Sequence, residues 1–155
     1  MKILNSIKQV YNYTKINKSI GFVPTMGKLH QGHISLINRS RKENDLTIAS
    51  IFVNPLQFNN KDDFLFYPKN HKTDIQLLKD NNLDALFIPS KKEATKLVST
   101  NSFTVNINNN FENCYESINR PEHFNGVATI VLKLNNIVQP NNIYFGQKDA
   151  LQCIV

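Results

Sequence analysis

The sequence predicts an α/β fold in which a doubly wound, mainly parallel β-sheet is covered by helices on both faces. Segments with strand character alternate with segments whose apolar residues recur at helical spacing, as expected for such a sheet. One strand-like segment, residues 46–53, is largely apolar, which is typical of a strand buried on both faces. The 155 residues fit one ordinary domain, and 41% hydrophobic residues suffice for a core.

The first half of the chain is predicted to contain two helices and two strands. Apolar residues at helical spacing indicate a helix within residues 2–17. Residues 19–23 are expected to form a short buried strand that stops at Pro24. A helix follows from Gly32 to Lys42, where basic residues near the C-terminal end suit the helix dipole. Residues 46–53 are predicted to form the next strand.

Two helix starts in the middle of the chain are marked by capping boxes. Thr73 with Gln76 opens one predicted helix, and Ser90 with Glu93 opens another. A strand over residues 83–88, ending before a proline, lies between the two helices. The alternation of helix and strand therefore continues.

The last third of the chain is expected to hold two strands and an apolar helix. Apolar residues alternate over residues 103–107, which predicts a half-exposed strand. Residues 126–138 are strongly apolar and predict a helix or a buried segment. Residues 143–145 predict a final strand, and a helix is expected from Gly146 onwards.

Composition narrows the classes of partner. The net charge of +6 comes from scattered lysines and arginines without interleaved aromatic residues, so no nucleic-acid partner is expected. No run approaches the roughly 18 apolar residues that span a bilayer, so no membrane partner is expected. The N-terminus is polar and has no long apolar segment, which argues against a signal peptide and for a cytoplasmic location.

The most informative motif follows the first predicted strand. His30 and His33 are three residues apart, so a helix that begins near Gly32 places both imidazoles on one side of its first turn. Free backbone N–H groups and the positive end of the helix dipole are expected there. Gly27 and Gly32 allow the backbone to approach a ligand closely. Together these features predict a cradle for polyphosphate.

This H-x-G-H pattern resembles the signature of the nucleotidyltransferase superfamily, which includes the class I aminoacyl-tRNA synthetases. The resemblance implies a Rossmann-like sheet and chemistry at the α-phosphate of ATP, where fixed donors stabilise negative charge in the transition state. Other nucleotide motifs are missing: no G-x-G-x-x-G follows a strand, and there is no G-x-x-x-x-G-K-[ST] loop. The remaining histidines, His71 and His123, are not at zinc-ligand spacing.

Five stretches narrow the resemblance to the pantothenate synthetases. The Gly-Phe-Val-Pro-Thr-Met-Gly run that leads into the two histidines resembles the opening motif of that family. Similar blocks follow in family order, at residues 50–58, 67–69, 120–129 and 145–152. The resemblance implies an ATP-dependent ligase of pantothenate biosynthesis.

The resemblance also implies the residues of the ATP site. One wall would consist of Met26, Gly27, Lys28, Leu29, His30, Gln31, Gly32 and His33. The other wall would consist of Gly146, Gln147, Lys148 and Asp149. Within this set His33 would be the proton donor or charge stabiliser, and His30 and Lys148 would be the other catalytic residues.

The implied reaction joins pantoate to β-alanine in two steps. The pantoate carboxylate attacks ATP to give pantoyl adenylate and pyrophosphate, and the amine of β-alanine then displaces AMP. Gln57 and Gln152 would hold pantoate, and Gln57 would also contact β-alanine. A neutral amide can donate to the carboxylate without quenching its nucleophilicity. Mg²⁺ would neutralise the phosphates, but no protein ligand for it is identified.

The resemblance further predicts how the chain is organised. Residues 1–155 would form the N-terminal nucleotide- and pantoate-binding domain, and the small C-terminal lid domain of the family is expected to be absent from this chain. Family members are dimers through this domain, so a homodimer is expected. Two alternatives stay open: an adenylyltransferase with another acceptor, and a non-catalytic nucleotide- or RNA-binding module.

Overall fold

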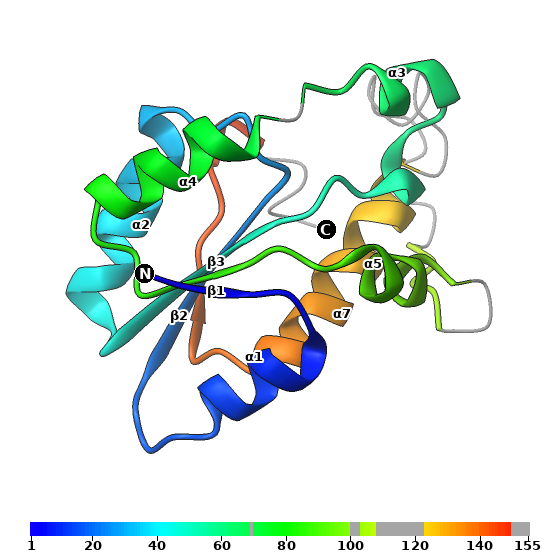
Figure 1. Cartoon of the computed structure of the whole chain (residues 1–155). Coiled ribbons are helices and arrows are strands. Elements are labelled where there is room, and N and C mark those ends of the chain that lie inside the picture. Colours follow the sequence, from blue (N-terminus) through cyan, green and yellow to red (C-terminus); the bar gives the residue numbers. More distant parts are fainter. Residues whose placement is uncertain (69, 100–102, 108–122, 150–155) are drawn as a thin grey trace.

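A computed structural model describes residues 1–68, 70–99, 103–107 and 123–149 of the chain. These residues form a five-stranded, wholly parallel sheet with helices on both faces, which confirms the predicted α/β fold (Figure 1). The strands of this sheet are β1 (Lys2–Leu4), β2 (Ile20–Thr25), β3 (Leu46–Ile51), β4 (Ala85–Phe87) and β5 (Asn142–Ile143).

The helices of the described ranges separate or follow these strands. The α-helices are α1 (Ile7–Thr14), α2 (Gln31–Glu43), α3 (Lys61–Leu65), α4 (His71–Asp80), α5 (Lys91–Val98) and α7 (His123–Val138). Two short 3₁₀ helices are η1 (Pro55–Gln57) and η2 (Gln147–Asp149). Over the described parts of the chain, every helix is too short or too polar to cross a bilayer.

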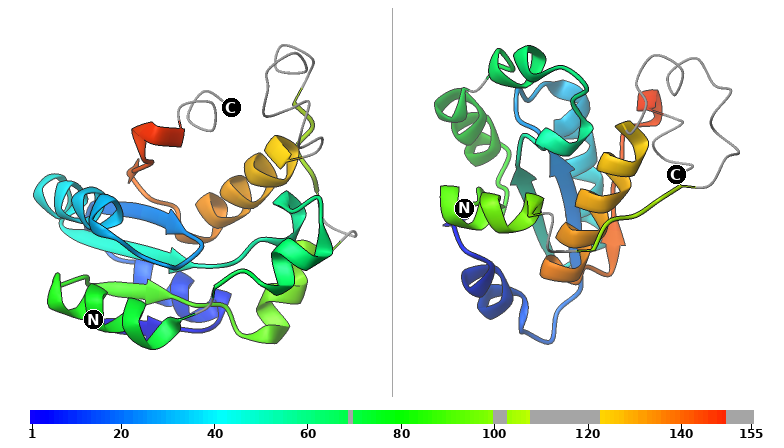
Figure 2. Two further views of the ribbon diagram at one scale, coloured as in Figure 1. Left: turned by 90° about the horizontal axis from the view of Figure 1, so that it is seen from above. Right: turned by 90° about the vertical axis from the view of Figure 1, so that its right-hand side faces the viewer.

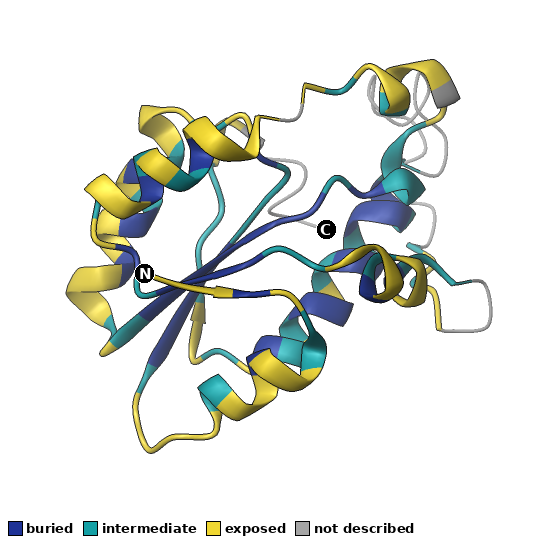
Figure 3. Ribbon diagram, in the orientation of Figure 1, coloured by how far each residue is buried: buried dark blue, intermediate teal, exposed yellow. Residues whose placement is uncertain are grey.

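Each face of the sheet has its own hydrophobic core. Figures 1 and 2 show α2 and α4 on one side of the strands and α1 and α7 on the other. Ile37 of α2 and Leu78 of α4 pack in one core, and Val10 of α1 and Leu134 of α7 pack in the other. The strands between them are buried along most of their length (Figure 3). Burial on both faces explains why these strands are apolar throughout rather than alternating.

The strand order β1-β4-β3-β2-β5 positions the site. From β2 the chain moves outward through β3 to β4, and it then returns across the sheet to place β5 on the other side of β2. The segments that leave the carboxyl ends of β2 and β5 therefore diverge. Crevices at such switch points are the usual ligand sites of doubly wound sheets.

The helix predicted within residues 2–17 begins later than the apolar spacing indicates. Residues 2–4 instead form β1, an edge strand that pairs with β4 from Lys2↔Ala85 to Leu4↔Phe87. The helix itself exists, but it begins after Ser6, whose side chain caps it in a box with Gln9. A three-residue strand is too short to show a period of two in the sequence, and pairing with β4 decides its conformation.

The strand predicted to stop before Pro24 continues through it to Thr25. Pairing with β5 ends where the Tyr144 N–H donates to the Phe22 carbonyl, at 2.9 Å. Successive residues of β2 direct their N–H and C=O groups alternately toward β3 and toward β5. Pro24, like Phe22, therefore faces β5, just beyond the last hydrogen bond between β2 and the segment of β5. Its missing N–H therefore costs no ladder hydrogen bond, and the pairing with β3 continues.

Two other predictions fail because a side chain takes the hydrogen bond that was expected elsewhere. Residues 103–107 are not a strand: the Val105 and Ile107 N–H groups donate to side chains of α7 instead of to another strand. The cap of α4 is Asn70, whose side chain accepts from the Thr73 N–H, so Thr73 lies inside the helix. The remaining predicted helices and strands are present with ends shifted by a few residues, and from residue 146 the described part is η2.

The long apolar segment near the C-terminus is helix α7, and Gly126 brings it against η1. A Cβ atom at Gly126 would lie 2.2 Å from the carbonyl oxygen of Leu56, which is backbone and cannot move aside easily. The Gly126 carbonyl also accepts from the buried Asn54 side chain at 3.0 Å. Close approach of the two backbones therefore fixes η1, and Gln57 within it, relative to α7.

We predict that Gly126→Ala destabilises the chain. In an ordinary helix interior this change stabilises by about 1 kcal/mol. Here the added methyl group overlaps the backbone of η1, so the sign reverses and the loss should be about 1–3 kcal/mol. Chemical unfolding followed by circular dichroism measures the change. An unchanged or higher free energy of unfolding would show that η1 does not pack tightly on α7.

Candidate functional site

A cavity of about 1040 Å³ opens at the carboxyl ends of the central strands. Its walls come from the segments that follow β2, β3 and β5, together with α7, α3 and the segment between α3 and α4. The cavity thus lies at the switch point, where a doubly wound sheet is expected to bind its ligand. It is large enough for a drug-sized ligand.

Most of the residues predicted for the site line this cavity. They are Met26, Gly27, Lys28, Leu29, His30, His33, Gln57 and Lys148. Gln31, Gly32, Gly146 and Gln147 are described but are not part of the lining. Helical geometry explains the first two, because residues 31 and 32 lie on the side of the first turn of α2 opposite to residues 30 and 33. Asp149 ends η2, and Gln152 lies outside the described residues.

His30 and His33 cap the N-terminus of α2 with their own side chains. The His30 Nδ1 accepts from the Gly32 N–H at 3.1 Å, and the His33 Nδ1 accepts from the His30 N–H at 3.3 Å. The two rings lie 4.2 Å apart between centroids. Since Nδ1 is the acceptor in both rings, the neutral form of each carries its proton on Nε2. In each neutral ring, the Nε2–H is therefore the group that can donate to a ligand.

This capping corrects the prediction of free backbone donors at the start of α2. The Gly32 N–H is taken by His30, and the His33 N–H donates to the His30 carbonyl at 2.9 Å. His30 thus satisfies two of the amides that a helix start leaves unpaired. The helix dipole still favours an anion nearby, with imidazole groups added beside it.

Gln57 is oriented by a chain of hydrogen bonds that starts at Asn54. The Leu56 N–H donates to Asn54 Oδ1 at 3.1 Å, so the Nδ2 of Asn54 is the atom that faces Gln57. This Nδ2 donates to Gln57 Oε1 at 3.1 Å. Because the oxygen of Gln57 is engaged inward, its amide nitrogen is the group left to donate to a ligand. Asn54 is only 1% exposed, which excludes water from this arrangement.

Several residues of the site were not assigned from the sequence. The apolar floor comes from Phe124, Val127 and Val131 of α7, whose spacing is that of any core helix and carries no sign of a ligand. His123 contributes a ring nitrogen 2.8 Å from the Gln57 carbonyl. Asp74 binds the backbone after β2 from α4, at the N–H groups of residues 28 and 29. No local pattern marks it, because its partners are more than forty residues away.

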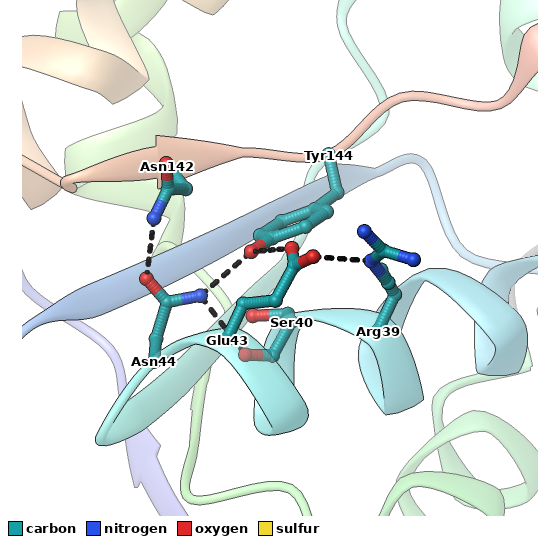
Figure 4. Close-up of polar contacts among 6 residues, drawn as sticks. All are labelled: Arg39, Ser40, Glu43, Asn44, Asn142 and Tyr144. Carbon is teal, nitrogen blue, oxygen red and sulfur yellow. Dashed lines mark hydrogen bonds and ion pairs between the residues drawn. The ribbon is translucent and has the colours of Figure 1, made fainter.

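The opposite wall follows β5, and a polar cluster ties that strand to the end of α2 (Figure 4). The Tyr144 hydroxyl donates to Glu43 Oε2 at 2.8 Å and accepts from Asn44 Nδ2 at 2.7 Å. Asn142 donates to Asn44 Oδ1 at 2.8 Å, and Arg39 pairs with Glu43. Tyr144 directly precedes Phe145, which lines the cavity. The cluster therefore holds the start of this wall.

Burial and charge shift the titration of two tyrosines at the site. Burial, and then the charge of Asp74, raises the pKa of Tyr67, which lines the cavity. Burial, followed by the hydrogen bond to Glu43, raises the pKa of Tyr144. The same hydrogen bond is the main cause of a lowered pKa at Glu43. Both hydroxyls therefore stay protonated at neutral pH and can act as donors.

Comparison with known proteins identifies the relatives of this chain. The family model described as pantoate-beta-alanine ligase matches residues 2–155. A pantothenate synthetase of Pseudothermotoga lettingae is 45% identical over 98% of this chain and 53% of its own length. One from Francisella tularensis subsp. novicida is 44% identical over 100% of this chain and 60% of its own length.

Solved structures agree with this result. The pantoate-beta-alanine ligase of Francisella tularensis, crystallised with beta-gamma ATP and beta-alanine, superposes with a TM-score of 0.92 and 45% identity, over 99% of this chain and 59% of the other. Pantothenate synthetase from Thermus thermophilus gives a TM-score of 0.92 and 38% identity, over 100% of this chain and 55% of the other. These likenesses confirm the Rossmann-like fold of the nucleotidyltransferase type. This chain spans little more than half the length of those relatives.

We predict that Tyr144→Phe lowers the stability of the chain at neutral pH and that the difference shrinks in acid. The folded-state pKa of Glu43 is lowered mainly by the Tyr144 hydroxyl, so this contribution is present above the ordinary carboxylate pKa. It is lost as the pH falls below about 4 and Glu43 becomes protonated. Urea unfolding at pH 7 and pH 3.5 measures both differences. Tyr11→Phe, at an exposed tyrosine of α1, is the control and should change little. A Tyr144→Phe loss that is equal at both pH values would contradict the assignment.

Proposed function

The chain belongs to the pantoate–β-alanine ligase family, and we propose that it supplies the ATP- and pantoate-binding part of an enzyme that joins pantoate to β-alanine. One observation carries the proposal: a single cavity is lined by both histidines of the H-x-G-H motif, by Gln57 and by Lys148. Three different strand ends contribute these groups. The cavity thus combines donors for phosphate with an amide donor for a carboxylate.

The proposed first step is attack of a pantoate carboxylate oxygen on the α-phosphorus of ATP. A new oxygen–phosphorus bond forms, the bond to the β-phosphate breaks, and pyrophosphate leaves with pantoyl adenylate remaining. The Nε2 donors of His30 and His33, with the cation of Lys148, would stabilise the negative charge that builds on the phosphate oxygens. In the second step the β-alanine amine attacks the acyl carbon and AMP leaves.

Gln57 is the proposed contact for pantoate, and for β-alanine in the second step. Its nitrogen is directed outward because Asn54 holds its oxygen, which suits a substrate carboxylate. Gln152 is the second proposed pantoate contact and lies outside the described residues. The Francisella tularensis relative was crystallised with beta-gamma ATP and beta-alanine, which supports ATP and β-alanine as ligands.

For Mg²⁺, the described part of the chain does not offer a resident site. Among the described residues, no group of three or more His, Cys, Asp or Glu side chains could hold a metal ion. We therefore assign no step to Mg²⁺. We propose that any Mg²⁺ is carried on the phosphates of ATP, which commonly supply much of its coordination in ATP-dependent enzymes.

Assembly and domain organisation stay predictions. We propose a homodimer, and we propose residues 1–155 as the N-terminal nucleotide- and pantoate-binding domain of a two-domain enzyme. The matched length supports the second proposal, since the chain covers 53–60% of its relatives. Full turnover would then depend on a lid that closes over the phosphates. The cytoplasmic location also stays a prediction.

We predict that His33→Ala reduces pyrophosphate release from ATP and pantoate by about 100-fold or more, the usual scale for losing one transition-state donor. The assay couples pyrophosphate to a colour reaction, with ATP binding measured in parallel by calorimetry. His71→Ala is the control, because His71 is an exposed histidine that also lies in the first turn of a helix, α4, but outside the cavity lining. Near-normal release by His33→Ala would remove His33 from the chemistry.

We predict that Gln57→Ala weakens pantoate binding by about tenfold or more and leaves ATP binding nearly unchanged. Gln57→Glu should be worse, because a carboxylate keeps the acceptor for Asn54 but replaces the outward donor with a negative charge. Calorimetric titration of each ligand separates the two effects. If ATP binding is lost and pantoate binding retained, the substrate assignment must be reversed. If the unaltered chain binds neither ligand, the proposed function is wrong.

A further inference from the structure

The loop after β2 contains an anion-binding nest that is already filled. Gly27 and Lys28 have positive φ angles of 87° and 52°. In this turn the successive N–H groups of Lys28 and Leu29 point toward one carboxylate, which makes a concavity for anions. The occupant is the side chain of Asp74: its Oδ2 accepts from the Lys28 N–H at 3.0 Å and its Oδ1 from the Leu29 N–H at 2.8 Å.

Asp74 is enclosed as a built part of this loop. It is only 4% exposed, and it reaches the loop from the first turn of α4. A Cβ atom at Gly27 would come within 3.0 Å of Asp74 Oδ2 and 3.2 Å of Ile51, so glycine leaves just enough room for the carboxylate. Each of its two carboxylate oxygens has a backbone partner. Charge-assisted bonds of this kind are stronger than neutral ones.

A simpler role for Asp74 would be to stabilise the N-terminus of its own helix, as acidic residues often do. The contacts do not fit that role alone. The cap of α4 is Asn70, whose side chain accepts from the Thr73 N–H at 3.3 Å. The two carboxylate oxygens of Asp74 instead bind a segment more than forty residues earlier in the chain. They hold the backbone that leads into His30.

The filled nest changes how a nucleotide can be held. The Gly27 N–H donates to Thr25 Oγ1, and the next two N–H groups donate to Asp74, so these donors are not available to phosphate. The donors next along the chain that can meet phosphate are the side chains of His30 and His33. An empty nest would offer a competing anion site a few residues before these histidines and would free a strained backbone to relax.

We propose that Asp74 is a positioning residue of the nucleotide site: its carboxylate fills the nest at residues 27–29 and so holds the loop that presents His30 to ATP. This inference rests on the proposed function, because it assumes that ATP is the ligand of the cavity. Asp74 does not touch the ligand in this role. It acts through the backbone of the loop.

The test compares Asp74→Asn with Asp84→Asn in the whole chain. Asparagine keeps the shape of the side chain but turns an NH₂ group toward one of the two backbone donors. Asp84 is the matched control, because its Oδ2 also accepts a backbone N–H, that of Thr47, at 2.8 Å. That bond lies at the amino ends of β3 and β4, away from the cavity. ATP affinity is measured by calorimetry and stability by thermal unfolding.

Asp74→Asn should raise the ATP dissociation constant about tenfold, equivalent to about 1.4 kcal/mol. Asp84→Asn should stay within about twofold, although both variants lose thermal stability. Pantoate binding should be spared by both variants, which a general loss of structure would not allow. Equal ATP affinity in Asp74→Asn and the unaltered chain, or an equal loss in Asp84→Asn, would overturn the proposal.

Amide hydrogen exchange of the unaltered chain gives a second readout that needs no variant. The Lys28 and Leu29 amides should exchange slowly without nucleotide, because both are bonded to a buried carboxylate. Rapid exchange at these amides in the folded chain would refute the filled nest, even if Asp74→Asn does not fold. If the unaltered chain fails to bind ATP while these amides are protected, the proposed function is wrong, but the contact between Asp74 and the loop is confirmed.

Discussion

Parallel pairing of the strands is the constraint on which the rest of the structure depends. Because neighbouring strands in the sheet run in the same direction, the segments that leave their carboxyl ends converge on one edge. The chain returns from β4 to place β5 on the other side of β2, so the segments that follow β2 and β5 diverge and leave a crevice at this edge. Residues as distant as His30, Gln57 and Lys148 meet in one cavity for this reason, although no local interaction joins them.

The segments around the cavity share a second feature: each is anchored to the rest of the structure by hydrogen bonds of a buried or half-buried polar side chain. Asp74 binds the loop after β2, Asn54 orients the segment after β3, and Tyr144 ties the segment after β5 to α2. Each anchor is itself paired, so the site is ordered before a ligand arrives. Preorganised donors stabilise developing charge without reorganisation, which suits chemistry on a phosphate.

Much of the fold and of the site was predictable because its signals are local. The apolar strands, the apolar helix α7 and the H-x-G-H motif are each contained in a short stretch of sequence, and all were identified with modest errors at their ends. Two of the failures share a cause in long-range pairing. The three residues of β1 become a strand only against β4, and residues 103–107 form no strand because the Val105 and Ile107 N–H groups donate to side chains of α7. The third failure is local, since the Gly32 and His33 N–H groups at the start of α2 both donate to His30.

The sequence by itself determined the α/β class, the family and the eight predicted site residues that line the cavity, because these depend on periodicity and on motifs with neighbouring members. Only the tertiary structure decided which nitrogen of each histidine is engaged by the backbone, how Gln57 is turned, and that Asp74 fills the nest beside Gly27. The first two details depend on how the folded backbone sets side chains against groups two or three residues away, and the third on bonds between segments more than forty residues apart. A side chain's sequence neighbours carry no record of those bonds, since the partners meet only when the sheet brings the strand ends together.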